Sequence, residues 1–136
     1  GVTEQNEYIF KKGRRVSNKK VSFVFRPGGK KTMQLITMQK LNQTVIKSSK
    51  KIIGKFEMYK DFADHQDIYF PLPIKDHNYY FTCVRKTELF IYPSCSVLIE
   101  LSSSLRVHAS FSRDRIEQGT KIVASIKSLL ISFKNK

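Results

Sequence analysis

The sequence predicts an α+β domain in which an antiparallel, twisted β-sheet is packed by a C-terminal α-helix. Two observations favour this fold class. Short segments of alternating polar and apolar residues recur along the chain, as in half-buried strands, whereas the last apolar residues recur at helical spacing. A chain of 136 residues, 40% of them hydrophobic, fits one domain with a packed core. We therefore expect a single domain over residues 1–136.

The first predicted strands form a hairpin. Residues 21–26 alternate, which predicts a strand whose Phe23 and Phe25 face the core. The sequence Arg-Pro-Gly-Gly-Lys at 26–30 predicts a turn, because proline presets φ and glycine permits positive φ. A second strand is expected over residues 32–38, which completes a hairpin with a basic turn.

The middle of the chain is more ambiguous. Residues 41–60 fit two further strands joined by a turn at 47–50, and a helix over part of this stretch is the alternative. We group residues 1–60 as a basic hairpin region. Residues 61–78 are expected to be an irregular connection, because two prolines exclude a helix interior there.

Residues 79–136 predict a β-meander followed by a helix. Apolar residues at helical spacing up to Phe133 indicate the helix. Asp114 and Glu117 fit a capping box at its start, and Gly119 is the alternative signal, which delays the start of the helix to Thr120. The four expected strands are Tyr79–Val84, Glu88–Tyr92, Val97–Leu101 and Leu105–Phe111.

Basic residues dominate the first half of the chain. Residues 1–60 contain 15 Lys/Arg and 3 Asp/Glu, whereas residues 61–136 contain 10 and 8. Such an excess repels itself in a compact state, and a docked polyanion relieves that repulsion. A solvated, soluble surface is the simpler interpretation, but the clustering of the charges favours binding. The residues expected to contact the partner are Lys11, Lys12, Arg14, Arg15, Lys19, Lys20, Lys30, Lys31, Lys47, Lys50, Lys51 and Lys55.

The sequence contains few of the motifs that are typical of an active site. The sequence lacks zinc-ligand spacing, a phosphate-binding glycine loop and a Gly-x-Ser-x-Gly nucleophile motif. We therefore expect no catalytic residue, metal or cofactor. The exception is Asp61-x-x-Asp64-His65-x-Asp67, in which carboxylates beside an imidazole suit a metal or acid/base work. An acidic loop that balances the basic half is the simpler interpretation, and we favour it.

The cysteines, the apolar runs and the N-terminus indicate in which cellular compartment the protein is found. Cys83 and Cys95 are too few for a disulfide scaffold and fit a reducing compartment, with a structural or incidental role for both. No apolar run reaches the length of a membrane span, and the N-terminus lacks the features of a signal peptide. We expect a cytoplasmic protein. Gly1 in place of Met suggests a processed protein or an excised fragment.

Three kinds of polyanion suit the basic residues. Nucleic acid is one, because lysine and arginine neutralise phosphates and aromatic rings stack on bases. An anionic membrane surface is the second, although no exposed segment for insertion is evident. An acidic stretch of another protein is the third, and it needs no stacking platform. The aromatic residues that interleave with the basic clusters are Tyr8, Phe10, Phe23, Phe25, Phe56 and Tyr59.

Residues 79–133 resemble a polo box, the C-terminal targeting module of polo-like kinases. A strand, a short turn and a second strand ending in an aromatic residue are followed by a polar turn and a Ser-x-Leu-Ile sequence. The positions that carry the resemblance are Tyr92, Pro93-Ser94-Cys95, Ser96 and Leu98-Ile99, with a long amphipathic helix over Lys121–Phe133. Pro93-Ser94 departs from the usual Asn-Asp or Asn-Gly turn. The chain also lacks tryptophan, so the resemblance does not imply phosphopeptide binding.

The resemblance implies the behaviour of the cryptic polo boxes of the centriolar subfamily. Those modules form homodimers and dock acidic segments of centrosomal scaffold proteins, and they target an attached kinase to the centriole. We accordingly expect a non-catalytic module that docks an acidic protein segment through its basic surface. The alternative is a nucleic-acid-binding module, or a viral matrix-type protein that binds RNA and anionic membrane.

Overall fold

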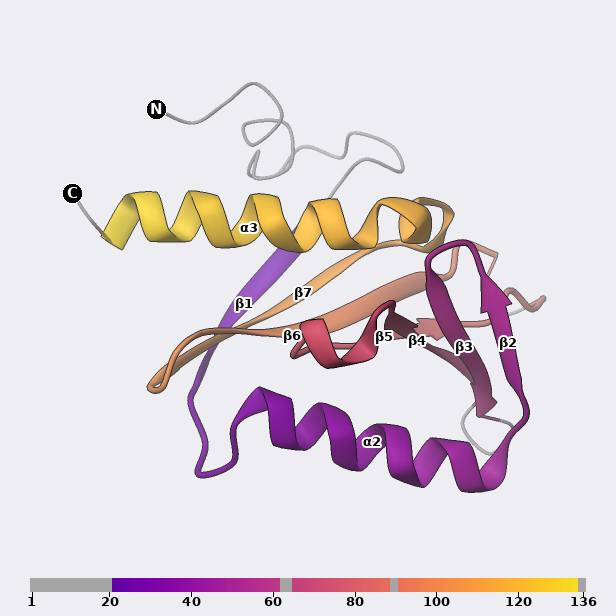
Figure 1. Ribbon diagram of the computed structural model, residues 1–136. Coiled ribbons are helices and arrows are strands. Elements are labelled where there is room, and N and C mark those ends of the chain that lie inside the picture. The colour runs from indigo at the N-terminus through magenta and orange to yellow at the C-terminus, as the bar shows by residue number, and fades with distance from the viewer. Residues whose placement is uncertain (1–20, 62–64, 89–90, 135–136) are drawn as a thin grey trace.

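A seven-stranded antiparallel sheet lies between two helices in the computed structural model, which describes residues 21–61, 65–88 and 91–134 (Figure 1). The predicted α+β class and the C-terminal helix are confirmed. The strands are β1 (Val21–Pro27), β2 (Lys50–Ile53), β3 (Phe56–Asp61), β4 (Gln66–Pro71), β5 (Phe81–Val84), β6 (Ser94–Ser102) and β7 (Leu105–Ser112). The helices are α2 (Met33–Lys47) and α3 (Gly119–Lys134), with short 3-10 helices at Ile74–Asp76 and Arg113–Gln118.

The sheet is a meander closed by one long-range pairing. Strands β2 to β6 each pair with the next strand in the chain, and β1 pairs with β7, so the order across the sheet is β1-β7-β6-β5-β4-β3-β2. Val21 lies opposite Phe111, and Pro27 lies opposite Leu105. The edges of the described sheet are therefore β1 and β2, and both belong to the basic half of the sequence.

Helix α3 covers the face of the sheet that holds the larger core. Ile122 and Ile126 of the helix pack against Phe81, Ile99 and Val107 of the sheet, and all five side chains are almost fully buried. The helix begins at Gly119, where a Cβ atom would lie 2.8 Å from Cζ of Phe81. Glycine at this position therefore lets the first turn of α3 approach the sheet closely.

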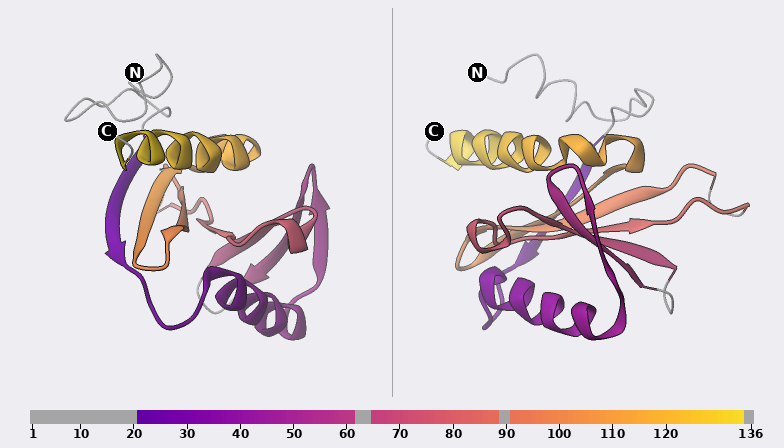
Figure 2. Two further views of the ribbon diagram at one scale, coloured as in Figure 1. Left: turned by 60° about the vertical axis from the view of Figure 1, so that its left-hand side comes forward. Right: turned by 45° about the vertical axis from the view of Figure 1, so that its right-hand side comes forward.

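Helix α2 lies against the opposite face of the sheet, as both views in Figure 2 show. The core on this side is smaller and consists of Tyr59, Ile68 and Phe70, with Leu41 of the helix packed against them. The helix begins after Thr32, whose Oγ1 accepts a hydrogen bond of 3.2 Å from the backbone N–H of Leu35. This is the N-cap arrangement that hydroxyl side chains favour.

The structure overturns the predicted hairpin over residues 21–38. The first strand is confirmed as β1, but residues 33–38 open helix α2 instead of forming a second strand. Met33, Thr37 and Thr44 recur at helical spacing and all are buried against the sheet. Packing of this face outweighs the local alternation, which is short enough to fit either element.

Two other segments differ from their predictions. Residues 61–78 contain strand β4, which is almost entirely buried, in place of an irregular connection. In contrast, the described part of 88–92 bends and forms no strand. The turn expected at 47–50 between two strands is confined to Ser48 and Ser49 and connects α2 to β2, because residues 41–47 form the helix that was the alternative there. The turn between β2 and β3 is at Gly54, whose φ is +58°. A positive φ of this size is favourable for glycine.

The two cysteines form a disulfide, which corrects the inference drawn from their number. Cys83 of β5 and Cys95 of β6 lie directly opposite each other in the antiparallel register, and both are fully buried. Adjacent strands thus place the two sulfur atoms together although twelve positions separate them in sequence. Because disulfides persist mainly in oxidising compartments, the cysteine count gives no support for a reducing one.

Candidate functional site

The basic turn between β1 and α2, residues 26–31, is held in a fixed position by the β6–β7 hairpin. The backbone N–H of Gly28 donates a hydrogen bond of 2.9 Å to the carbonyl of Ser104. A Cβ atom on Gly28 would lie 2.2 Å from the carbonyl oxygen of Ser103, so only glycine allows this approach. The turn therefore rests directly on the hairpin.

A buried ion pair fixes the far side of the same turn. Arg106 of β7 is 8% exposed, and its guanidinium donates a hydrogen bond to the carbonyl of Lys31. It also lies 3.8 Å from the carboxylate of Glu100, its cross-strand neighbour on β6. Oε2 of Glu100 in turn accepts a 2.9 Å hydrogen bond from the N–H of Met33, the first residue of α2. Arg106 and Glu100 thus set where the helix starts and where the turn ends.

The lysines of this turn are exposed and form no ion pair with a carboxylate of the described residues. Lys30 and Lys31 lie on the surface, and Lys31 Nζ makes a 3.4 Å hydrogen bond to Gln39. The three ion pairs among the described residues all use arginines of the second half of the chain. Residues 21–56 contain eight Lys/Arg and no Asp/Glu. The positive charge of the turn is therefore not neutralised by a carboxylate of the described residues.

The predicted basic residues that the structure describes form two groups. Lys30 and Lys31 lie at the start of α2, whereas Lys50 and Lys51 on β2 follow its end (Figure 1). A helix of 15 residues separates the two groups by roughly 22 Å. Lys55, also exposed, lies in the turn after β2. The side chain of Lys47 lies outside the described residues, as do Lys11, Lys12, Arg14, Arg15, Lys19 and Lys20.

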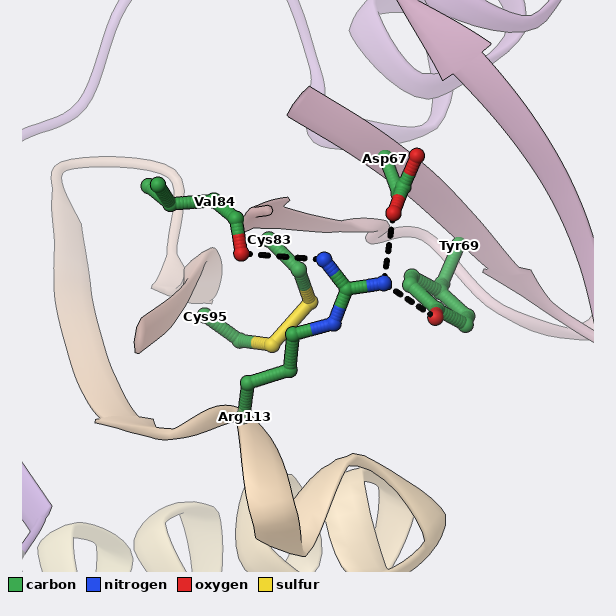
Figure 3. Close-up of a disulfide and its surroundings, with 6 residues drawn as sticks. All are labelled: Asp67, Tyr69, Cys83, Val84, Cys95 and Arg113. Carbon is green, nitrogen blue, oxygen red and sulfur yellow. Dashed lines mark hydrogen bonds and ion pairs between the residues drawn. A yellow bond between two sulfur atoms is a disulfide. The ribbon is translucent and has the colours of Figure 1, made fainter. Parts of the chain in front are cut away.

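Of the acidic cluster predicted around residues 61–67, the structure places the side chain of Asp67 between two arginines. Asp67 is 4% exposed and accepts hydrogen bonds from two arginines. Its Oδ1 accepts a bond of 2.9 Å from Nε of Arg85, and its Oδ2 accepts a bond from Nη2 of Arg113. Arg113 also donates to the Tyr69 hydroxyl, beside the disulfide (Figure 3). Among the described residues no three His, Cys, Asp or Glu side chains gather as metal ligands. Asp64 lies outside those residues. Asp67 is thus the centre of an internal ion-pair network.

Among the described residues, three of the four candidate stacking aromatics belong to the core or pack against it, whereas Tyr8 and Phe10 lie outside the described residues. Phe56 and Tyr59 are 4% and 2% exposed, and Phe23 is partly buried against the α3-side core. Burial raises the pKa of Tyr59, as does the hydrogen bond that its hydroxyl donates to Glu57. Phe25 is the exception, because half of its side chain is exposed. The prediction that Phe23 and Phe25 face the core thus holds for the first and is wrong for the second.

The sequence did not reveal an apolar groove beside β1. This groove of about 440 Å³ is bounded by the end of β1, the β6–β7 hairpin and the second half of α3. Its lining residues are Phe25, Leu101, Ser102, Ser104, Leu105, Leu130 and Ile131. The alternation in 21–26 pointed Phe25 inward, but nothing in the sequence showed that α3 leaves the end of β1 uncovered. Ser104 both lines the groove and accepts the hydrogen bond from the basic turn.

Comparisons with protein-family models, with curated proteins and with solved structures find no match for this chain. The polo-box resemblance stays a prediction. Among the described helices, none has the length and apolar character needed to cross a membrane.

Proposed function

We propose that the chain is a non-catalytic module that docks an acidic segment of a partner protein through the basic turn at residues 26–31. The observation that carries the proposal is the combination of a fixed backbone with unneutralised charge. Hydrogen bonds from Gly28 and Arg106 hold the turn, while Lys30 and Lys31 stay exposed and no carboxylate within 21–61, 65–88 or 91–134 forms an ion pair with them. Charges held in this way attract an anionic partner without a large ordering cost at the moment of binding.

A protein partner suits the turn better than nucleic acid. Nucleic acid bound without sequence preference needs aromatic faces on which bases stack, in addition to lysines. Phe56 and Tyr59 are buried and give no such platform, and Phe25 is the one candidate aromatic of the described residues that is exposed beside the turn. Carboxylates of an acidic peptide require only the positive charges themselves.

The lysines of β2 have a second interpretation. Natural proteins place lysines on edge strands, where they prevent association with other sheets. Lys50 and Lys51 occupy half of the four-residue strand β2, which is one edge of the sheet. We therefore assign docking to the turn and treat the β2 group as edge protection.

The test compares two polyanions at two salt concentrations. The full chain is titrated with a synthetic peptide of glutamate and aspartate and, separately, with single-stranded oligonucleotide. We expect the acidic peptide to bind more tightly, with an affinity that falls as salt screens the charges. The variant Lys30→Glu/Lys31→Glu should weaken peptide binding by about tenfold at low salt.

The matched control makes the same change of charge elsewhere. Lys75 and Lys121 are exposed and lie outside the basic half, so Lys75→Glu/Lys121→Glu should alter the affinity much less. Equal losses in both double variants would mean that only net charge matters, and the turn would lose its role. Tighter binding of the oligonucleotide, lost in the Lys30 and Lys31 variant, would assign the turn to nucleic acid.

A further inference from the structure

The two edges of the sheet differ in how they are protected. Edge β2 is short and carries two exposed lysines, whereas β1 has seven residues, of which only Arg26 is charged. Pro27 ends the strand. No strand of the described residues pairs with the outer edge of β1, so alternate backbone N–H and C=O groups of β1 face outward. An edge without charge protection is a template for another extended chain.

Apolar surface accompanies this open edge. Val24 and Phe25 point to opposite faces of the sheet and are 56% and 52% exposed. Phe25 also forms one wall of the apolar groove, with Leu130 and Ile131 of α3 on the other side. An extended peptide that paired with β1 would send alternate side chains to the two faces. On the α3 face, one of these side chains would meet the groove.

The basic turn continues directly from the same strand. Arg26 ends the run of β1 side chains on the α2 face, and Lys30 and Lys31 follow within the turn. Ser104 lines the groove and accepts the hydrogen bond of Gly28, so the groove lies next to the basic turn. A peptide at this end of β1 would therefore lie near both apolar and positive surface. The site therefore favours a segment that combines apolar and acidic residues.

We propose that the acidic segment of the partner binds as an added strand along the outer edge of β1, which rests on the function proposed above. An apolar side chain of the segment enters the groove, and its carboxylates lie against Arg26, Lys30 and Lys31. This is β-strand addition, in which backbone hydrogen bonds give affinity and pockets for alternate side chains give specificity. A second copy of the chain fits less well, because each copy brings a first half that contains 15 Lys/Arg and 3 Asp/Glu.

The probe is a short peptide that alternates glutamate with valine and phenylalanine, titrated against the full chain. Its control has the same sequence with methylated backbone nitrogens, which keeps the charge and removes the hydrogen-bond donors. We expect the methylated peptide to bind about tenfold more weakly. Hydrogen exchange of the backbone N–H groups of β1 should slow when the unmethylated peptide is added.

Two variants at side chains of nearly equal solvent exposure test whether the peptide uses the groove. Phe25→Ser should weaken binding of the peptide by roughly tenfold, because the peptide side chain loses an apolar wall. Ile52→Ser is the control, since Ile52 is 53% exposed on the protected edge β2, and it should leave the affinity unchanged.

The outcomes of these experiments distinguish strand addition along β1 from acidic docking in general. Equal affinity of the two peptides, together with a loss in Lys30→Glu/Lys31→Glu, would keep acidic docking and overturn strand addition. If the outward N–H groups of β1 are already protected in the free chain, the edge is covered by the chain itself. Protection that grows with protein concentration would assign the edge to a second copy. Binding to anionic vesicles that Phe25→Ser abolishes, without peptide binding, would assign it to a membrane.

Discussion

Replacement of Asp67 by asparagine should destabilise the protein strongly. Asp67 is 4% exposed and is the shared acceptor of Arg85 and Arg113. Asparagine has nearly the same shape but no charge, so the substitution leaves two partly buried guanidinium groups without their counter-ion. Both arginines keep hydrogen bonds to backbone carbonyls, Arg85 to Asp61 and Gln66 and Arg113 to Val84, which limits the loss.

The size of the loss follows from these contacts. Removing one partner of a buried ion pair costs about 3–5 kcal/mol. The arginine side chains are 24% and 21% exposed, so water compensates part of this, and we expect about 3 kcal/mol. With an unfolding entropy of about 2.1 cal/mol/K per residue, this lowers Tm by roughly 10 °C.

The assay is urea unfolding at neutral pH, followed by circular dichroism, with a thermal melt of the same samples. Asp114→Asn is the control, because Asp114 is exposed near the same network, and it should change the free energy of unfolding by less than about 0.5 kcal/mol. A loss below about 1 kcal/mol for Asp67→Asn would show that the network does not stabilise the fold. A gain in stability would point to an active-site carboxylate held at a cost to the fold, as functional residues often are.

Three other predictions concern the fold and the turn. Replacing both Cys83 and Cys95 by alanine should lower the free energy of unfolding by about 3 kcal/mol, since the bond closes a short loop, and urea unfolding with and without reductant checks this. Burial raises the pKa of Tyr79 to about 12 from 10.0, so its contribution to stability is complete below pH 10 and is lost as pH rises towards 12. Burial also raises the pKa of Tyr59 and of Tyr80, so phenolate absorbance should show several tyrosines that titrate late, together with alkaline unfolding. A Tyr79→Phe variant should lose one equivalent of this late absorbance. Gly28→Ala should cost about 1–3 kcal/mol and weaken binding of the acidic peptide, because its Cβ collides with a backbone carbonyl. Gly54→Asn is its control, since no atom lies within 4 Å there and asparagine tolerates positive φ; equal losses in the two variants would contradict the steric argument.

The sequence predicted the elements whose periodicity is long and consistent. The apolar spacing from Ile122 to Leu130 indicated α3, and the alternation in 97–101 and 105–111 indicated β6 and β7. Strand β4 was missed because both of its faces are buried, so its residues do not alternate as those of a half-buried strand do. Helix α2 was expected only as the alternative for part of residues 41–60, and its first half was missed. The reason is that its buried face includes Thr37 and Thr44, which give no hydrophobic signal.

The candidate site could be predicted only in part. Lys30 was expected at the end of a turn over 26–30 and Lys31 beside it, and both lie on the connection after β1, although that connection leads to α2 and not to a strand. The restraint on that turn depends on Glu100 and Arg106, about 70 residues later in the chain, and no local pattern reveals such a contact. The expectation of one basic face required knowledge of α2, because that helix holds the two groups of lysines apart. The disulfide likewise depends on strand register and not on cysteine number.

The most direct test of acidic docking at the turn is an NMR titration of the uniformly labelled full chain with the acidic peptide. The account predicts that backbone signals of Val24 to Lys31, and of Ser104 beside them, shift first and saturate together. Signals of Lys121 on the outer side of α3 should not move. Shifts spread evenly over every exposed lysine, or centred on β2, would contradict the assignment of the partner to the turn.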